Sequence, residues 1–385
     1  MLALRLARGS HPLVLLRRLF VAAASAGTGF LLLSALGHAA GHPAAGDSLA
    51  RLLWCAAPLA ATTQLAVSVA RTDPAARLQR GMTAAGLGPL RLTLLAAAST
   101  ALSCVLGVLL SLLVFLRLRG DLGGPTVVDS DPDLLGAGHP LPLPGALMLL
   151  AAVPLAGAAA TALSLRPRTE PGYRDSEPHS ITAPTGLPWG VALTAAGLAV
   201  EAYTSPVTDA HGGVLPLPGR LLGSAPGVLA GWALAALGLV LAGPGLVHLS
   251  GQLLCAGRPG AQRLLSGRVL QEESHRLGRP LGVLCAVASG AYAAVTVYGN
   301  TPSRSVGPLT AIGTSVIFAC VTASALAAAL ESRSARARTT AALRRLGAPV
   351  SVLQRATALR AVALTLVLGP LTWTVAEMAT LPLVR

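Results

Sequence analysis

The stretch ESRSARARTTAALRRLGAPVSVLQR, residues 331–355, holds six arginines and lies between two long apolar runs. Ala, Leu and Arg are strong helix formers, so the stretch predicts a helix. Leu343 and Leu346 fall on one face of that helix, because residues three positions apart are neighbours on a helix surface. The stretch therefore predicts a short basic helix that is tied at both ends to apolar segments.

The ends of this helix carry their own signals. Ser332 or Ser334 is placed to cap the N-terminus, since a serine hydroxyl accepts a hydrogen bond from a backbone N–H of the first turn. Gly347 and Pro349 are placed to stop the helix, because glycine adopts the left-handed conformation at a helix C-terminus and proline cannot continue the helix. We therefore expect a defined helix and not an irregular loop.

The composition of the chain indicates its class. Of the 385 residues, 53% are hydrophobic and 11% are charged, and the mean hydropathy is +0.66. In soluble domains about a quarter of the residues are charged. The net charge of +14 does not indicate nucleic-acid binding, because the basic residues form short blocks with almost no aromatic side chains to stack on bases. The composition predicts an integral membrane protein.

Nine apolar runs are long enough to cross a bilayer, which takes about 17 to 25 helical residues. They are residues 19–37, 52–70, 92–116, 143–165, 187–203, 225–250, 281–298, 308–330 and 361–384. The fifth is the weakest, since it is short and contains Pro188 and Glu201. The first is expected to be a retained helix and not a signal peptide, because eight more runs follow it. The predicted fold class is all-α, with about nine transmembrane helices.

The arginines alternate along the chain. All 29 basic residues are arginine, and short cytoplasmic loops of membrane proteins retain positive charge. With the N-terminus in the cytoplasm, 23 arginines fall in inner segments and six in outer segments. We therefore expect a multi-pass protein of the cell membrane with a cytoplasmic N-terminus, in which residues 331–355 also lie in the cytoplasm.

The first and last thirds of the chain repeat one order of features, and internal repetition of this kind predicts a repeated structural unit. In each, a Ser-His pair precedes an apolar run, and a basic segment, at residues 71–91 and 331–355, joins the second run to the third. The pairs are Ser10-His11 and Ser274-His275. We expect a first repeat at 1–118, a middle part with an outer loop and three spans at 119–250, and a second repeat at 251–385. Each repeat is expected to open on an amphipathic elbow helix.

The end of the basic stretch resembles the cytoplasmic signature of FtsX-like permeases, the membrane subunits of a class of ABC transporters. In that family a basic helix ending in Leu-Arg-x-Leu-Gly-Ala joins the second and third spans of a unit. The matching residues here are Leu343, Arg344, Arg345, Leu346, Gly347 and Ala348. The pattern is degraded in the first repeat, where the residues that still match are Arg77, Leu78, Arg80 and Gly86.

The overall plan is similar to that of the ten-span permeases of the bacitracin-export type, over nearly the whole chain. It departs from them because the large extracytoplasmic domain within a unit and the tenth span are missing. The resemblance implies a permease whose basic helices dock on separate ATPase subunits, two per permease chain. It implies export or extraction of an amphipathic, lipid or peptide substrate, with no enzymatic activity in this chain and no cofactor.

Other functions fit the same residues. From charge alone, the basic stretch is also explained as a positive-inside loop that holds the topology. A non-transporting permease that pulls on an extracytoplasmic partner would keep the basic helix, whereas an ion-coupled secondary carrier would need acidic residues at mid-membrane. A phosphate-binding GxxxxGK[ST] loop is excluded in a chain without lysine, so an ATPase would have to be another polypeptide.

Two glutamates, Glu201 and Glu377, lie inside apolar runs and within about two helical turns of the predicted outer boundary. Pairing with a neighbouring helix or snorkelling explains such residues. Alternatively they form a polar patch in an outer cavity that meets a cationic or amphipathic substrate. The acidic loop at 129–133 lacks the glycine and the distal glutamate of a calcium loop. The expected partners are therefore ATPase subunits and membrane lipids, with no metal and no nucleic acid.

Reporter fusions test the predicted topology. Fusions after Arg119, Arg174, Arg220 and Arg345 are expected to report outside, inside, outside and inside, because the arginine-rich segments stay in the cytoplasm. The activities of a periplasmic and a cytoplasmic reporter at each position provide the measurement. An inside signal at Arg220 would contradict the nine-span topology.

Overall fold

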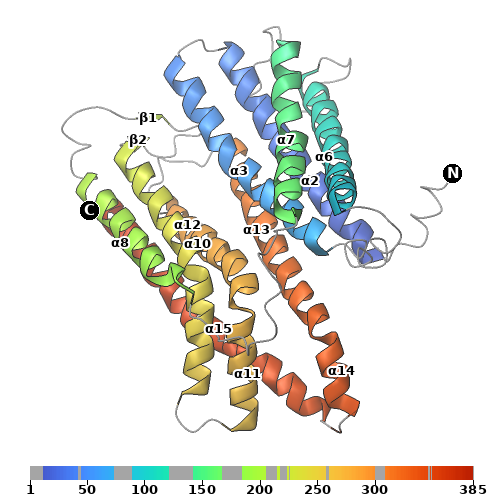
Figure 1. The fold of residues 1–385 in the computed structure, drawn as a ribbon. Helices are drawn as coiled ribbons and strands as arrows, with labels where there is room; N and C mark the ends of the chain where they lie inside the picture. Colours follow the sequence, from blue (N-terminus) through green and yellow to red (C-terminus); the bar gives the residue numbers. More distant parts are fainter. Residues whose placement is uncertain are drawn as a thin grey trace, which may run out of the picture. The chain divides into compact units, whose positions relative to one another are not determined.

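The described chain is helical, apart from two strands of two residues each (Figure 1). The computed structural model describes residues 12–41, 45–72, 89–120, 142–166, 184–204, 215–216, 223–224, 226–256, 260–299, 308–345, 347 and 349–384. The helices are α2 (Pro12–Gly41), α3 (Ala45–Thr72), α6 (Pro89–Arg119), α7 (Leu143–Leu165), α8 (Gly186–Thr204), α10 (Pro226–Cys255), α11 (Ala261–Glu272), α12 (Ser274–Gly299), α13 (Pro308–Ala335), α14 (Ala337–Arg345) and α15 (Val350–Val384). The strands are β1 (Leu215–Pro216) and β2 (Gly223–Ser224).

Eight of these helices are long and apolar enough to cross a membrane. The candidate spans are Leu15–Ala40, Arg51–Arg71, Thr93–Arg119, Leu143–Leu165, Ala230–Cys255, Ser274–Thr296, Leu309–Ala335 and Val350–Leu381. They correspond to eight of the nine apolar runs, so the prediction of an all-helical, multi-pass chain is confirmed. The fifth run forms α8, which has 19 residues and is not among the eight. The ninth span and the repeated architecture stay predictions.

The contacts of the chain divide it into two compact units. The first comprises Met1–Thr169, Leu215–Leu222 and Val306–Ser324, and the second comprises Glu170–Val214, Gly223–Ser305 and Ala325–Arg385. Helix α13 therefore contributes its N-terminal part to the first unit and its C-terminal part to the second. These units are defined by contacts and not by sequence repetition, so the division at 118 and 250 stays a prediction.

Helix α2 lies at the centre of the first compact unit and packs on α3, α6 and α7. Leu33 and Phe115 are completely buried in its core, where the rings of Phe30 and Phe115 meet edge to face with centroids 6.0 Å apart. The hydroxyl groups of Thr28 and Thr62 form a 2.8 Å hydrogen bond that joins α2 to α3. Interhelical hydrogen bonds of this kind stabilise helix pairs in lipid, where the hydrophobic effect no longer favours helix association.

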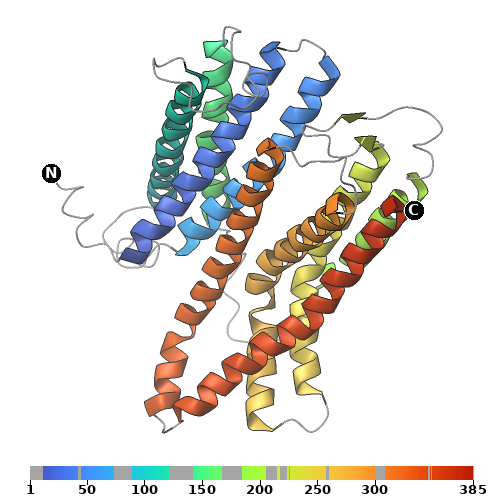
Figure 2. The ribbon, with the colours of Figure 1, turned by 180° about the vertical axis from the view of Figure 1, so that it is seen from behind.

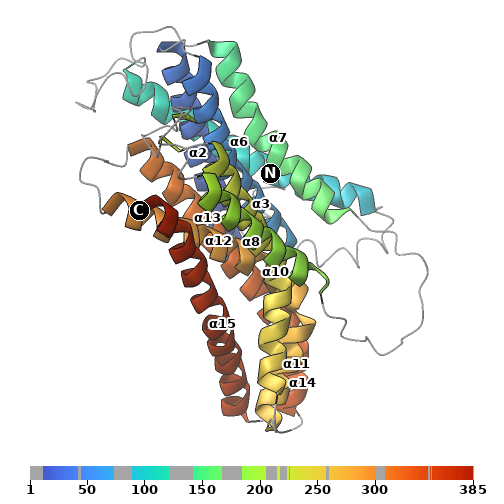
Figure 3. The same cartoon turned by 90° about the vertical axis from the view of Figure 1, so that its left-hand side faces the viewer.

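Helix α10 lies at the centre of the second compact unit and packs on α8, α11, α12 and α15 (Figure 3). Glycines allow the backbones of α8, α11 and α12 to approach it closely. A Cβ atom at Gly231 would lie 2.7 Å from the carbonyl oxygen of Gly197 on α8. A Cβ atom at Gly251 would lie 2.7 Å from the carbonyl oxygen of Gly267 on α11. Because any side chain would separate the helices, small residues set the spacing of this unit.

Helix α15 completes the second compact unit. It runs alongside α12, as Figure 2 shows, and it also contacts α11. The hydroxyl of Ser266 on α11 donates a 3.2 Å hydrogen bond to the carbonyl oxygen of Ala356 on α15. The segment expected to form an elbow helix is helical as α11, and its Ser266, Gly267 and Leu270 are buried. Its position relative to a membrane stays a prediction.

Candidate coupling segment

We use the name coupling segment for residues 331–355, which comprise the end of α13, helix α14 and the start of α15. A single residue, Arg336, separates α13 from α14. The backbone N–H of Arg336 donates to the carbonyl oxygen of Ser332 at 3.2 Å, and the backbone N–H of Thr340 donates to that of Arg336 at 2.8 Å. Helical hydrogen bonding therefore continues across the junction, which is a bonded turn and not a free loop.

The prediction that Ser332 or Ser334 caps the basic helix is wrong. Both serines lie in the last turns of α13, where their hydroxyls donate to the carbonyl oxygens of Ala329 and Glu331 at 2.9 and 2.8 Å. The apolar run of α13 carries the helix past both serines, so α14 begins at Ala337. Serine hydroxyls inside a helix commonly bond back to the preceding turn in this way.

The predicted stop of the basic helix is confirmed. Helix α14 ends at Arg345, and Gly347 has a φ of +90°, a backbone conformation that strongly favours glycine. The N–H of Gly347 donates to the carbonyl oxygen of Arg344 at 3.0 Å. Pro349 precedes α15, and its carbonyl oxygen accepts a 3.1 Å hydrogen bond from the N–H of Val352. A tight turn thus connects α14 to α15.

The residues that match the permease signature lie on and after α14. Arg344, Arg345 and Gly347 are exposed in the chain. The backbone of Leu343 lies within α14, whereas Leu346 and Ala348 lie outside the described residues. The signature residues of the first repeat also lie outside the described residues: Arg77, Leu78, Arg80 and Gly86. Their role in coupling stays a prediction.

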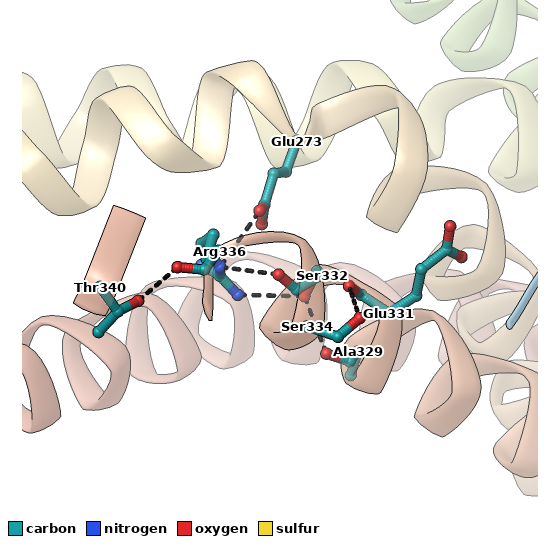
Figure 4. Close-up of polar contacts among 7 residues, drawn as sticks. All are labelled: Glu273, Ala329, Glu331, Ser332, Ser334, Arg336 and Thr340. Atoms are coloured by element: carbon teal, nitrogen blue, oxygen red, sulfur yellow. Dashed lines mark hydrogen bonds and ion pairs between the residues drawn. The ribbon is translucent and has the colours of Figure 1, made fainter. Parts of the chain in front are cut away.

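An ion pair ties the coupling segment to the corner between α11 and α12. Figure 4 shows Glu273, the single residue between those helices, pointing toward Arg336. The Nε atom of Arg336 lies 3.2 Å from Oε1 of Glu273 and also donates to the carbonyl oxygen of Ser332 at 3.1 Å. Its Nη2 atom donates to the Ser332 hydroxyl at 3.1 Å. Arg336 is therefore fixed by its own helix and by Glu273 together.

Burial sets the electrostatics of this pair. The side chains of Arg336 and Glu273 are 24% and 11% exposed. Burial raises the pKa of Glu273 above its ordinary value, and the charge and hydrogen bond of Arg336 act in the opposite direction. Among the described residues, no donor reaches the buried Oε2 atom of Glu273. Because desolvation offsets much of the attraction in such pairs, we assign this one to positioning more than to stability.

The two glutamates inside apolar runs have separate aromatic partners. Glu201 on α8 is completely buried, and the indole Nε1 of Trp232 on α10 donates to its Oε1 atom at 2.6 Å. Glu377 on α15 accepts hydrogen bonds from Tyr292 and Trp373. Pairing with a neighbouring helix was one of the two interpretations from the sequence, and both glutamates form such pairs. A role in an outer cavity stays a prediction.

Sequence reasoning missed the ion pair between Glu273 and Arg336. In the sequence, Glu273 is one polar residue of an expected elbow helix, and Arg336 is one of six arginines in a basic stretch. One signal was present, since Glu272 and Glu273 are adjacent acids in an otherwise arginine-rich segment. Acidic residues in a basic region are candidates for ion pairs, but the sequence does not identify the arginine.

No metal centre is found in the part of the chain that the structure describes, where no three His, Cys, Asp or Glu side chains are grouped to hold an ion. The coupling segment is the candidate site with the most defined geometry.

In comparisons with known proteins, no family model, no curated protein and no solved structure matches the chain.

The raised pKa of Glu273 predicts how stability depends on pH. Its carboxyl is protonated more readily in the folded chain than in the unfolded chain, so ionisation costs the folded state free energy. The stability of the wild type relative to Glu273→Gln should therefore fall as pH rises from the ordinary value of 4.5 through the higher folded pKa. Chemical unfolding of both proteins in detergent, from about pH 4 to about pH 8, gives this difference.

A second variant, Glu273→Ala, serves as the control for the ion pair. Glu273→Ala leaves Arg336 without its acceptor at the corner of α11 and α12, and this loss should cost about 1–3 kcal/mol more than Glu273→Gln, which keeps one. If the wild type and Glu273→Gln have parallel stability profiles across the pH range, the carboxyl does not titrate with folding and the account of its burial is wrong.

Proposed function

We propose that the chain is the permease subunit of an ABC transporter of the FtsX-like class and that its coupling segment binds a separate ATPase. The observation that carries this proposal is helix α14, a short basic helix held between two candidate membrane spans. Arg344 and Arg345 are exposed on it. The Leu-Arg-Arg-Leu-Gly-Ala sequence at its end supplies the resemblance to the permease family.

The placement of α14 suits the transmission of a push from a soluble partner. Its N-terminal end is joined to α13 by a bonded turn, and its C-terminal end is joined to α15 by the turn at Gly347. A displacement of α14 would therefore act on both of these candidate spans. A free cytoplasmic loop, by contrast, would absorb such a displacement through its own backbone.

The ion pair supplies a second route for that displacement. Arg336 contacts Glu273, which lies where α11 meets α12, and α11 is held against α10 at Gly251 and Gly267. A push on the coupling segment would thus also reach the centre of the second compact unit. Coupling of this kind needs packed elements that can take two discrete arrangements, and closely packed helices are suitable elements.

The ATPase in this proposal is another polypeptide, because a chain without lysine cannot form a GxxxxGK[ST] phosphate-binding loop. Two ATPase subunits would bind one permease chain, one at each basic segment. The first segment, residues 71–91, lacks the central arginine and leucine of the signature. We therefore expect the second segment to bind its ATPase more tightly and the complex to be asymmetric.

The substrate would be an amphipathic molecule, a lipid or a peptide, exported across or extracted from the cell membrane. A non-transporting permease that uses ATP to act on an extracytoplasmic partner would keep the same coupling segment. Proteoliposomes that contain the permease and its ATPase distinguish these functions. Stimulation of ATP hydrolysis by an added lipid or peptide supports transport, whereas an ion-coupled carrier would act without ATP.

Truncation of the two signature leucines tests the docking. Apolar side chains at the centre of an interface each contribute about 2 kcal/mol or more to binding. The double variant Leu343→Ala, Leu346→Ala should therefore lose the ATPase in detergent pull-downs while still inserting normally. Arg344→Ala should bind less well at low salt and with a weaker dependence on salt, because charges at the rim act mainly on association.

The matched control is a second pair of leucines, on another exposed helix. Leu264 and Leu265 on α11 are 47% and 37% exposed and lie outside the signature, so Leu264→Ala, Leu265→Ala should keep the ATPase. If the Leu343, Leu346 variant keeps the ATPase as well as this control does, the basic stretch is a positive-inside loop and the coupling proposal fails.

A further inference from the structure

Three side chains from two helices meet at Glu377. The phenolic hydroxyl of Tyr292 on α12 donates to Oε1 of Glu377 on α15 at 2.7 Å. The indole Nε1 of Trp373, one turn earlier on α15, donates to the same oxygen at 3.0 Å. Two donors on one oxygen fix the orientation of the carboxylate. No described residue donates to the second oxygen, Oε2, which remains able to accept a hydrogen bond from a ligand.

The cluster is accessible on the surface of the second compact unit. Trp373 is 64% exposed and Tyr292 is 40% exposed, and the neighbouring Met378 is 58% exposed. No described arginine forms an ion pair with Glu377. An acidic side chain and two aromatic rings are therefore available together, without a basic partner among the described residues.

The depth of the cluster fits the boundary between lipid headgroups and acyl chains. Tyr292 lies four residues before the end of the candidate span Ser274–Thr296, and Glu377 lies four residues before the end of Val350–Leu381. At 1.5 Å per residue both are about 6 Å inside the ends of their spans. A carboxylate at this depth is costly without a counter-charge, whereas tyrosine and tryptophan are enriched there.

These features favour an organic ammonium group over other cations. A metal ion such as Ca²⁺ needs six to eight oxygen ligands, and among the described residues no group of acidic or His and Cys side chains provides them. An ammonium group needs one counter-charge and gains from contact with the faces of aromatic rings, as in sites that recognise choline. Glu377 provides the counter-charge, and Trp373 and Tyr292, which are 64% and 40% exposed, provide aromatic surface beside it.

We propose that Glu377, Trp373 and Tyr292 form a binding site for an organic ammonium group at the membrane boundary. The group belongs to a lipid headgroup or to a soluble amine, and in either case Glu377 supplies the counter-charge while the rings contact the cation. The proposed site depends on the geometry of α12 and α15 and not on the binding of an ATPase, so it is independent of the proposed function.

A second glutamate–tryptophan pair in the chain, Glu201 and Trp232, provides an internal control. Glu201 and Trp232 repeat the indole-to-carboxylate hydrogen bond at 2.6 Å, but Glu201 is completely buried. A ligand cannot reach that carboxylate without moving α8 from α10. Any effect of an ammonium probe should therefore appear at Trp373 and not at Trp232.

The test is ¹⁹F NMR of the full chain labelled with 5-fluorotryptophan, in nanodiscs of phosphatidylglycerol, which has no amine. Trp373→Phe assigns the signal of Trp373, and the other tryptophans serve as internal controls. Tetramethylammonium chloride should shift the Trp373 signal saturably, and sodium chloride at the same concentration should not. Glu377→Gln, which keeps an acceptor for both donors, should bind tetramethylammonium at least about tenfold more weakly.

A second variant guards against a folding defect. Tyr292→Leu removes the aromatic ring on α12 but leaves the carboxylate of Glu377 and the fluorinated Trp373. This variant should also bind tetramethylammonium several-fold more weakly. Unchanged signals of Trp54, Trp189 and Trp232 show that each variant is folded. If both variants bind tetramethylammonium as the wild type does, the assigned site is wrong.

A lipid arm identifies the source of the ammonium group. Replacing part of the phosphatidylglycerol with phosphatidylethanolamine should shift the Trp373 signal and compete with tetramethylammonium if the ligand is a headgroup. If phosphatidylethanolamine has no effect while tetramethylammonium binds, the ligand is a soluble amine. The proposal is overturned if neither changes the Trp373 signal, or if methylguanidinium alone does, since that result indicates an arginine of a partner protein.

Discussion

Close backbone contact between helices is the constraint on which the second compact unit depends. Gly251 on α10 and Gly267 on α11 allow the backbones of these two helices to approach closely. A side chain at either position would collide with the carbonyl oxygen of the other glycine. This contact fixes α11 against α10 and thereby fixes the corner at Glu273. The ion pair with Arg336 then holds the start of α14 at that corner. The geometry of the coupling segment thus depends on two glycines in helices that precede it in sequence.

The elements of the fold could be read from the sequence because hydrocarbon imposes strong rules. A chain that crosses a bilayer must satisfy every backbone N–H and C=O group internally, so an apolar run of sufficient length forms a helix. Eight of the nine runs meet this description. The remaining run forms α8, a helix of 19 residues that carries Glu201 near its end and is not among the eight candidate spans. The sequence does not show that Glu201 is completely buried and accepts a hydrogen bond from Trp232 on α10.

The candidate site was only partly predictable, for a physical reason. The stop at Gly347 is a local property of the backbone, and the sequence predicted it. The start was not, because Ser332 and Ser334 would cap a helix only if α13 ended before them. The end of an apolar helix depends on residues spread over several turns, and α13 continues to Ala335. The partner of Arg336 is 63 positions away in sequence, and no local pattern identifies such a contact.

The central claim is that α14 and the turn after it contact an ABC ATPase in the cell. A photoreactive amino acid at position 345, in cells that contain the host's ATPases, tests it most directly. The same amino acid at position 265, on the exposed face of α11, is the reference. The account predicts that position 345 cross-links to a polypeptide with a GxxxxGK[ST] motif and that position 265 does not. Cross-links from position 345 that contain only lipid, or no nucleotide-binding polypeptide, would contradict it.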